Sequence, residues 1–359
     1  MRFFAAAAVV FYHFGKQHVG HVPDFVRNVA GGGANGVALF FILSGFVLAY
    51  NYADSAQAGR LDKAEFWKAR IARVYPVYLL SLVLTVSRFA NYLHYALHPV
   101  SPANVLRALT SFAMVVTLTQ AWDASRSFLW NFPSWTLSVE MLFYLTFPWA
   151  CAAVCRLKPT KLLTAACALV ILSFLRFVLI SKLPPADGFW IWAGSEWPPM
   201  RLPEFFLGLV LGRMYLVRSD IRIRHRDAAA MLATAGIVTV VGFGPQLGIF
   251  VAPLLDPLFA VLIYALASGP GFVARCLSLP LLVLLGNASY AVYILQVPIM
   301  NAVNKIFGFY GLTFFAGLLA LTGISTASYL YFETPARRWI RKRWVDRNEP
   351  LPAEAALVR

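Results

Sequence analysis

The chain has 359 residues, of which 60% are hydrophobic and only 13% are charged, and its formal net charge is +15 at pH 7. So few charged side chains cannot cover an apolar interior with a soluble surface, which excludes an ordinary water-soluble domain. The basic residues fall in short clusters between apolar stretches, a pattern typical of membrane-protein loops that argues against a nucleic-acid partner.

Apolar runs separated by polar, Pro-rich or Gly-rich breaks predict transmembrane helices along nearly the whole chain. A bilayer core about 30 Å thick needs about 20 such residues for each helix. We therefore expect an all-α, polytopic membrane protein with a single domain over 1–340 and a polar tail over 341–359. The ten predicted spans are 2–14, 36–52, 74–92, 137–155, 162–181, 203–217, 228–244, 249–267, 281–302 and 312–333.

The distribution of basic residues predicts the orientation of these spans. If the weaker apolar stretch 106–122 does not cross, one set of loops and the tail hold 20 basic residues and the opposite loops hold seven. The positive-inside rule then places both termini in the cytoplasm and puts 16–35 and 183–200 outside. Counting 106–122 as a span would reverse the basic loop 156–161, so we expect 106–122 to be re-entrant or interfacial.

The first predicted helix carries two ionisable residues, Arg2 and His13, in an otherwise apolar run. Eleven residues at 100° each place them on one face, about 16 Å apart along the helix axis. His13 then lies near the middle of the bilayer, where burial favours a neutral imidazole that can accept a proton. A histidine hydrogen-bonded into a helix interface explains the same pattern, and both interpretations stay open. Since the run lacks a basic n-region and a small-residue cleavage site, we expect a retained helix.

Two further charged groups occur at predicted helix ends. Arg70 and Arg73 share a face at i, i+3 where the span 74–92 begins, and two guanidinium groups there suit phosphate oxygens. Ordinary positive-inside anchoring accounts for the same arginines, so this role is also open. Glu140 lies about one turn inside the span 137–155, where a buried carboxylate needs a partner or a chemical task.

The later predicted spans also contain polar residues, and each group of them has two interpretations. Arg201 and Glu204 stand at i, i+3 and suit a structural ion pair, with substrate contact as the alternative. Ser289, Tyr293 and Gln296 form a polar stripe that lines a cavity or bonds to neighbouring helices. The four cysteines have neither the spacing of a zinc site nor the setting of a disulfide framework, so we expect no metal.

In their order along the chain, these residues resemble the acyltransferase 3 family of bacterial membrane acyltransferases, which includes O-antigen and exopolysaccharide O-acetyltransferases. The resemblance covers almost the whole chain. It rests on R-x10-H at Arg2 and His13, GVALFFILSGF, RIARVYP with Arg70 and Arg73, SWTLSVE ending at Glu140, RLPEFFLG, LGNASYAVYIL and the terminal FETPARR.

The resemblance implies an enzyme of the bacterial inner membrane that transfers an acyl group, expected to be acetyl, from acyl-CoA to a hydroxyl of a carbohydrate or lipid-linked glycan. His13 would take the proton from the hydroxyl, and Arg2 would orient the donor or stabilise negative charge. Arg70 and Arg73 would hold the CoA phosphates, and Glu140 is a further catalytic candidate. Direct transfer and a covalent acyl-His13 intermediate both stay open.

The chain departs from the family pattern at Gln296, where the family often has His, and at Met1, which alone precedes Arg2. Because the first predicted helix is also short, we expect that a few residues precede Met1 in a longer form. We expect no appended hydrolase-like SGNH domain, in which case onward transfer of acyl groups would need another protein. The rival functions are a transporter of a sugar, lipid or drug and a glycan polymerase or flippase partner without acyl chemistry. The sequence lacks the paired broken helices of inverted-repeat transporters, and it assigns no oligomeric state.

Overall fold

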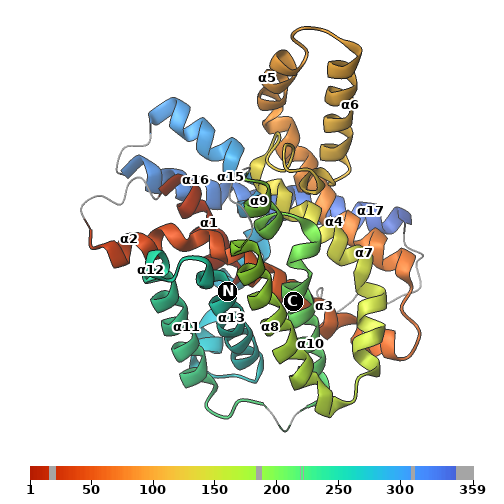
Figure 1. The fold of residues 1–359 in the computed structure, drawn as a ribbon, viewed down its shortest axis with the longest axis vertical. Helices are drawn as coiled ribbons and strands as arrows, with labels where there is room; N and C mark the ends of the chain where they lie inside the picture. Colours follow the sequence, from red (N-terminus) through yellow and green to blue (C-terminus); the bar gives the residue numbers. More distant parts are fainter. Residues whose placement is uncertain (16–21, 183–187, 219, 221, 309–311, 345–359) are drawn as a thin grey trace.

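The computed structural model describes residues 1–15, 22–182, 188–218, 220, 222–308 and 312–344 (Figure 1). Every regular element in these ranges is helical and no strand occurs in them, which confirms the all-α prediction. The helices are α1 (Arg2–Val10), α2 (Asp24–Gly31), α3 (Gly36–Gln57), α4 (Lys63–Leu84), α5 (Val86–Ala96), α6 (Pro102–Val116), α7 (Trp135–Arg156), α8 (Leu162–Ser181), α9 (Phe189–Ser195), α10 (Leu202–Val217), α11 (Arg226–Gly242), α12 (Gly244–Leu247), α13 (Val251–Ala267), α14 (Phe272–Leu277), α15 (Pro280–Phe307), α16 (Leu312–Ser328) and α17 (Thr334–Trp344). Two π-helical turns, η1 (Phe11–Gly15) and η10 (Tyr329–Glu333), continue α1 and α16.

Helices occupy all ten predicted segments, but they are not ten confirmed membrane crossings. Among the described residues, five helices are long and apolar enough to cross a membrane. A sixth is added if α4 and α5, which bend by 63° at Thr85 in the middle of the predicted span 74–92, count as one crossing. Several other apolar helices, such as α13, are shorter than the roughly 20 residues that a bilayer core requires.

Helices α3 and α10 form the tightest contact in the bundle because glycines lie where their backbones meet. A Cβ atom added to Gly208 would lie 1.8 Å from the carbonyl oxygen of Ile42, and one added to Gly45 would lie 2.0 Å from that of Phe205. Small residues allow such close approach between membrane helices, which gain stability from packing rather than from the hydrophobic effect. Both helices contribute side chains to the two apolar clusters of the core.

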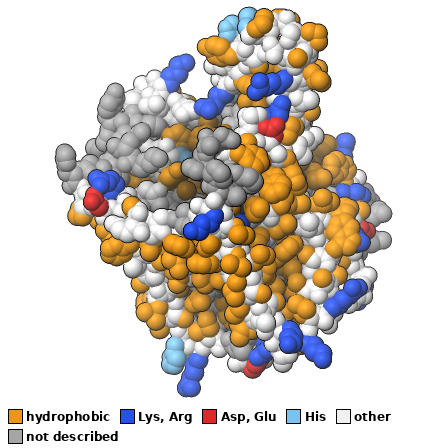
Figure 2. All heavy atoms as spheres, in the orientation of Figure 1, with side chains coloured by type: hydrophobic (Ala, Val, Ile, Leu, Met, Phe, Trp, Pro, Cys, Tyr) orange, Lys and Arg blue, Asp and Glu red, His pale blue; other side chains and the backbone are white. Residues whose placement is uncertain are grey.

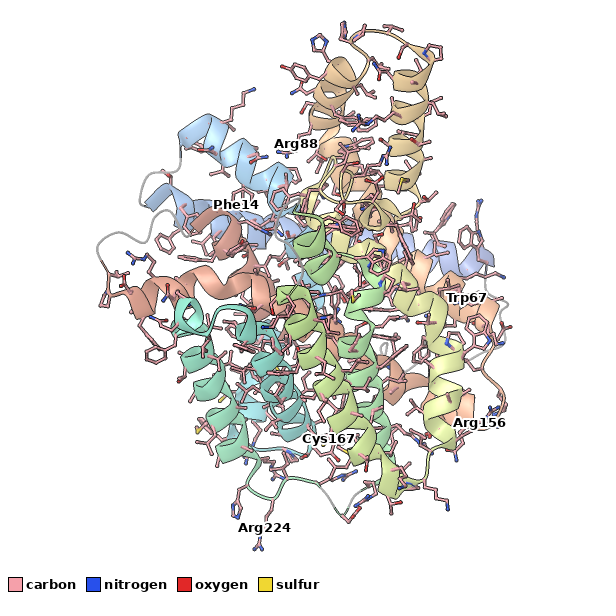
Figure 3. The ribbon with its side chains drawn as sticks, in the orientation of Figure 1. Phe14, Trp67, Arg88, Arg156, Cys167 and Arg224 are labelled. Atoms are coloured by element: carbon pink, nitrogen blue, oxygen red, sulfur yellow. The ribbon has the colours of Figure 1, made fainter. Side chains whose placement is uncertain are left out.

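The outer surface of the bundle is strongly apolar, as contact with lipid requires. On the face drawn in Figure 2, hydrophobic side chains gather over its middle and lower part, with basic side chains at the lower edge. Helix α8 shows the pattern clearly, since Ile171 and Leu179 are 58% and 66% exposed. Figure 3 shows Arg224 projecting from the lower end of the bundle. These surfaces support a membrane protein.

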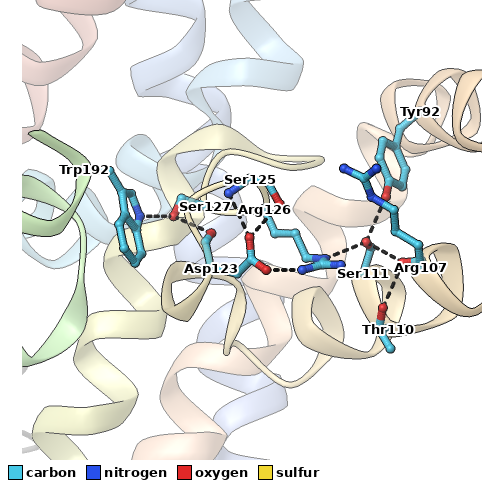
Figure 4. A network of polar contacts seen from close by, with 9 residues as sticks. All are labelled: Tyr92, Arg107, Thr110, Ser111, Asp123, Ser125, Arg126, Ser127 and Trp192. Atoms are coloured by element: carbon cyan, nitrogen blue, oxygen red, sulfur yellow. Dashed lines mark hydrogen bonds and ion pairs between the residues drawn. The ribbon is translucent and has the colours of Figure 1, made fainter. Parts of the chain in front are cut away.

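A helical hairpin of α5 and α6 projects from one end of the bundle (Figure 1). A polar network at its base, drawn in Figure 4, ties it to the loop before α7. The hydroxyl of Ser111 on α6 lies 2.9 Å from that of Tyr92 on α5 and accepts a hydrogen bond from Arg126 Nε at 3.0 Å. Arg126 also pairs with Asp123, and Trp192 of α9 donates to Ser127 Oγ at 2.6 Å. The predicted re-entrant or interfacial stretch 106–122 thus lies largely in this hairpin, and its relation to the membrane stays a prediction.

The C-terminal helix α17 packs beside α4, where Lys68 Nζ donates to the carbonyl oxygen of Trp344 at 3.2 Å. The first residues of the predicted polar tail, 341–344, belong to this helix. The rest of the tail, 345–359, lies outside the described residues, as do parts of the predicted outer loops at 16–21 and 183–187. Helix α2 occupies much of the remainder of the first of these loops.

Candidate functional site

Two small cavities inside the bundle share part of their lining. The aromatic cavity lies between α1, α3, α7 and α15 and is lined by Phe41 and Tyr293 among other residues. The arginine cavity lies between α1, α3, α4, α7 and α15 and is lined by Arg70 and Arg73 among other residues. Each has a volume of about 40 Å³. The residues that line both, which we call the junction, are Arg2, Phe40, Glu140 and Tyr290.

The junction brings the first residue of α1 together with the carboxylate of α7. Glu140 accepts a hydrogen bond at 2.9 Å from the hydroxyl of Tyr144, which stands one turn later on the same helix. Tyr290 of α15 donates at 2.7 Å to the carbonyl oxygen of Val74 on α4 and so links these two helices at the junction. The partly buried carboxylate therefore has both a hydrogen-bond donor and a guanidinium group, that of Arg2, in the same cavity walls.

Both arginines of the predicted pair line the arginine cavity, as their i, i+3 spacing on α4 allows. Arg70 is buried, and its guanidinium carbon lies 5.8 Å from the ring centres of both Tyr52 and Phe66. One guanidinium nitrogen donates to the Tyr52 hydroxyl at 3.3 Å. With Arg2, three guanidinium groups and the Glu140 carboxylate line this cavity, so its charged side chains favour an anionic ligand.

His13 lies in the π-helical turn η1 and pairs with Gln296 of α15. Its Nδ1 is 2.8 Å from Gln296 Oε1, while Gln296 Nε2 donates to the carbonyl oxygen of Tyr293 at 2.6 Å. Since that carbonyl can only accept, the amide oxygen faces His13 and Nδ1 must carry the proton. The lone pair of the neutral ring is then on Nε2, the nitrogen that can accept a proton.

The predicted residues on α15 thus point to two different places. Tyr293 lines the aromatic cavity together with Ser289, whereas Gln296 is fully buried against His13. His13 itself is not among the residues that line either cavity, and the edge of its ring packs against Phe132 with ring centres 4.7 Å apart. The structure therefore gathers Arg2, Glu140 and Tyr293 around one cavity, whereas His13 lines neither of these two cavities.

Arg201 and Glu204 form the predicted ion pair, with Arg201 NH1 2.9 Å from Glu204 Oε1. Arg176 of α8 adds a second contact to the same oxygen at 3.2 Å, and all three side chains are buried. The pair does not line either cavity, but the Arg201 guanidinium lies 5.2 Å from the ring centre of Phe41, which does. The Arg201–Glu204 pair therefore packs behind Phe41, on the side of the wall that faces away from the aromatic cavity.

Several residues around the site were not selected from the sequence. Tyr52, Tyr144 and Tyr290 gave no signal, because tyrosine is common in apolar helices and only the tertiary contacts reveal their partners. Glu333, at the end of η10, is 2% exposed and lies within the electrostatic influence of Arg73, Arg337 and Arg2. Its position in the FETPARR motif could have identified it, since a carboxylate in an apolar stretch needs a partner.

Within the described part of the chain, no group of three or more His, Cys, Asp or Glu side chains could hold a metal ion. The polar groups available at the site are therefore the arginines, the carboxylates, the tyrosine hydroxyls and His13. Such groups can bind an anion, orient a substrate and move a proton.

Comparison with known proteins identifies the family of this chain. A family model described as an acyltransferase domain matches residues 1–332. Acyltransferase MdmB of Streptomyces mycarofaciens is 27% identical over 98% of this chain and 94% of its own length. The exopolysaccharide production protein ExoZ of Rhizobium meliloti is 28% identical over 87% of this chain and 92% of its own length.

O-acetyltransferase OatA of Staphylococcus aureus (strain NCTC 8325) is 24% identical over 94% of this chain, which spans only 56% of the OatA length. No solved structure matches the chain. The family match covers nearly all of the described helices, including every residue of the two cavities. The chain belongs to the acyltransferase family and is a membrane O-acyltransferase.

Proposed function

We propose that the protein transfers an acyl group, most simply acetyl, from acyl-CoA to a hydroxyl of a carbohydrate or lipid-linked glycan. The observation that carries this proposal is the arginine cavity, where Arg2, Arg70 and Arg73 face one small volume beside Glu140. Three guanidinium groups suit the phosphates of a CoA donor. The names of the relatives OatA and ExoZ support a hydroxyl acceptor on a polysaccharide.

In the proposed reaction, His13 Nε2 takes the proton of the acceptor hydroxyl as the oxygen attacks the thioester carbonyl. The new C–O bond forms, the C–S bond breaks, and the departing CoA thiolate receives the proton from His13. Gln296 holds the Nδ1–H tautomer that this step needs. A covalent acyl-His13 intermediate is the variant of this scheme, and rapid-quench labelling with radioactive acyl-CoA distinguishes it from direct transfer.

The other charged residues have positioning roles in this scheme. Arg70 and Arg73 hold donor phosphates, and Arg2 orients the donor or stabilises negative charge on the thioester oxygen. Glu140 supplies Arg2 with a counter-charge at the junction. Arg2 and His13 lie about 16 Å apart along their helix, so the extended arm of the donor must cover this distance. Tyr293 and the pair Arg201 and Glu204 shape the aromatic cavity on the acceptor side.

We also propose that the enzyme lies in the bacterial inner membrane with both termini in the cytoplasm, on the basis of the 20-to-seven distribution of basic residues. The arginine cavity would then open toward the compartment that supplies acyl-CoA. Labelling of single cysteines from outside intact cells should succeed at 188–195 and fail at 222–225. The reverse pattern would contradict the orientation.

The test of the reaction compares acyl-CoA turnover in membranes that contain matched amounts of wild-type, His13→Ala and His13→Gln protein. General-base catalysis typically supplies a rate factor of about 10² to 10⁴, and both variants should lose that much. Release of free CoA and the mass of the acylated glycan are the two readouts. His94→Ala, on the projecting hairpin, is the matched control. Near-normal turnover by His13→Gln would contradict the catalytic role, because an amide cannot accept the proton.

A further inference from the structure

A third cavity, the α17 cavity, lies where α3 ends and α4 begins, and α17 contributes to its wall. Its volume is about 440 Å³, compared with about 40 Å³ for the arginine cavity. Small-molecule sites commonly have volumes of about 300 to 1,000 Å³. The α17 cavity is therefore large enough for a ligand, and neither the motif residues nor the reaction has accounted for it.

Two guanidinium groups from distant parts of the chain line this cavity: Arg60, in the connection between α3 and α4, and Arg341, on α17. Among the described residues, no salt bridge engages either of them. Two guanidinium groups in the lining of one cavity suit a ligand with phosphate groups, to which arginine offers paired donors.

The same cavity also carries hydrogen-bond acceptors and an aromatic side. Asp62, which caps α4 by accepting from the backbone nitrogen of Glu65 at 3.1 Å, lines the cavity together with Glu65. These carboxylates would repel a bare phosphate, but they suit amino and hydroxyl groups of a larger ligand. The combination of arginines, carboxylates and the rings of Tyr52 and Phe66 matches a phosphorylated nucleoside better than inorganic phosphate.

The α17 cavity is next to the proposed donor site. Tyr52 and Phe66 line it, and the same two rings flank the guanidinium of Arg70, which lines the arginine cavity. A ligand bound in the α17 cavity would therefore have its far end within reach of the arginine cavity. A large cavity beside a small one fits a donor whose bulky polar end occupies the α17 cavity and whose narrow reactive arm extends toward the arginine cavity.

We infer that the α17 cavity binds the nucleotide end of the acyl donor, with Arg60 and Arg341 on its phosphates and Asp62 and Glu65 accepting from its amino or hydroxyl groups. The inference rests on the proposed acyl-CoA reaction. In this arrangement α17 is part of the donor site, and Arg70 and Arg73 bind the phosphates nearest the thioester-bearing arm of the donor. The headgroup phosphate of a lipid is the competing source of the same chemistry.

The test compares two donors, acetyl-CoA and acetyl-pantetheine, which carries the same thioester without the nucleotide. Purified Arg341→Ala and Arg60→Ala proteins in uncharged-lipid nanodiscs should show KM for acetyl-CoA raised about tenfold to a hundredfold, with kcat retained. Their KM for acetyl-pantetheine should equal that of the wild type. Arg343→Ala is the matched control on the same helix, because Arg343 stacks on Trp339 at 4.4 Å and does not line the cavity.

Equal effects of Arg341→Ala on both donors would overturn the inference, as would an unchanged KM for acetyl-CoA in both variants. An effect that appears only in nanodiscs with anionic lipid would assign the cavity to a lipid headgroup instead. Binding of adenosine 3′,5′-bisphosphate by calorimetry gives a readout that needs no turnover. The wild type could bind this nucleotide, and lose that binding in Arg341→Ala, yet transfer no acetyl group. That outcome would support the nucleotide site and contradict the proposed reaction.

Discussion

The hydrogen bond between Gln296 and His13 leads to a quantitative prediction. Gln296→Met keeps the side-chain volume but removes both the amide oxygen, 2.8 Å from His13 Nδ1, and the donor to the Tyr293 carbonyl. Without the amide oxygen, nothing from position 296 holds the Nδ1–H tautomer. A neutral hydrogen bond contributes about 0.5 to 1.5 kcal/mol, which corresponds to a factor of about two to twelve in a population or a rate.

We therefore expect Gln296→Met to lower kcat about two- to twelvefold, far less than His13→Ala, and to leave KM for acyl-CoA unchanged. Equal losses in kcat and kcat/KM would indicate an interaction needed only in the transition state. The assay is release of free CoA by purified protein over a range of acyl-CoA concentrations.

Gln120→Met is the matched control, because Gln120 is equally buried but its amide nitrogen donates to Ser134 rather than to Tyr293. Both variants should lower the melting temperature, but only Gln296→Met should lower kcat. An unchanged kcat in Gln296→Met would refute the tautomer argument. A loss of 100-fold or more in a folded protein would also refute it, since Gln296 would then take part in the chemistry itself.

Three further predictions concern other parts of the molecule. Arg73→Ala should raise KM for acyl-CoA about tenfold or more. Arg73→Lys should recover little of the lost affinity, because an ammonium group cannot supply the paired donors of a guanidinium group. An unchanged KM in Arg73→Ala would leave Arg73 with membrane anchoring as its role. Gly208→Ala should lower the stability of the fold by about 1 to 3 kcal/mol, since the added Cβ would lie 1.8 Å from the Ile42 carbonyl oxygen. Gly286→Ala is the control and should be tolerated, because no atom lies within 4 Å of its added Cβ. Equal melting temperatures of the two variants would contradict the close α3–α10 contact. Burial alone raises the pKa of Asp123, but hydrogen bonds from Ser125 and the nearby Arg126 guanidinium bring it below its usual value. This carboxylate therefore stabilises the hairpin base at neutral pH, and the contribution is lost as pH falls through the lowered pKa. Pepsin cleavage at 97–131 should increase across that acidic range in the wild type and less in Asp123→Asn, and identical profiles would contradict the role of the ionised carboxylate.

Much of the fold follows from local sequence patterns. Apolar length predicts the helices. The i, i+3 spacing places Arg70 and Arg73 on one face, and both line the arginine cavity; the same spacing predicts the ion pair that Arg201 forms with Glu204. The bend at Thr85 escaped prediction because the predicted span 74–92 is largely apolar on both sides of the bend, and hydropathy alone does not distinguish a bent helix from a straight one. Apolar length does not by itself give the number of membrane crossings, since short apolar helices can pack inside a bundle without spanning it.

The site is harder to predict because its geometry depends on contacts between distant helices. The R-x10-H spacing identifies Arg2 and His13, yet it does not show that Arg2 lines two cavities while His13 pairs with Gln296. The stripe on α15 predicts polar residues on one face, but their separate partners come from α1 and the cavity walls. Tyr290 and Glu333 lie far along the chain from the other site residues, so no local pattern connects them.

The small volume of the two inner cavities has a consequence for turnover. At about 40 Å³ each, they have room for only a few water molecules, so neither can hold an acyl group together with its acceptor. The side chains of Arg2, Phe40, Glu140 and Tyr290 must therefore move apart before the two substrates can meet. Because α3 is locked to α10 by backbone contact, that motion must come from α1, α4, α7 or α15. In the conformation described here, the proposed acyl donor and its acceptor could not both occupy this site, so their binding would have to be coupled to separation of these helices.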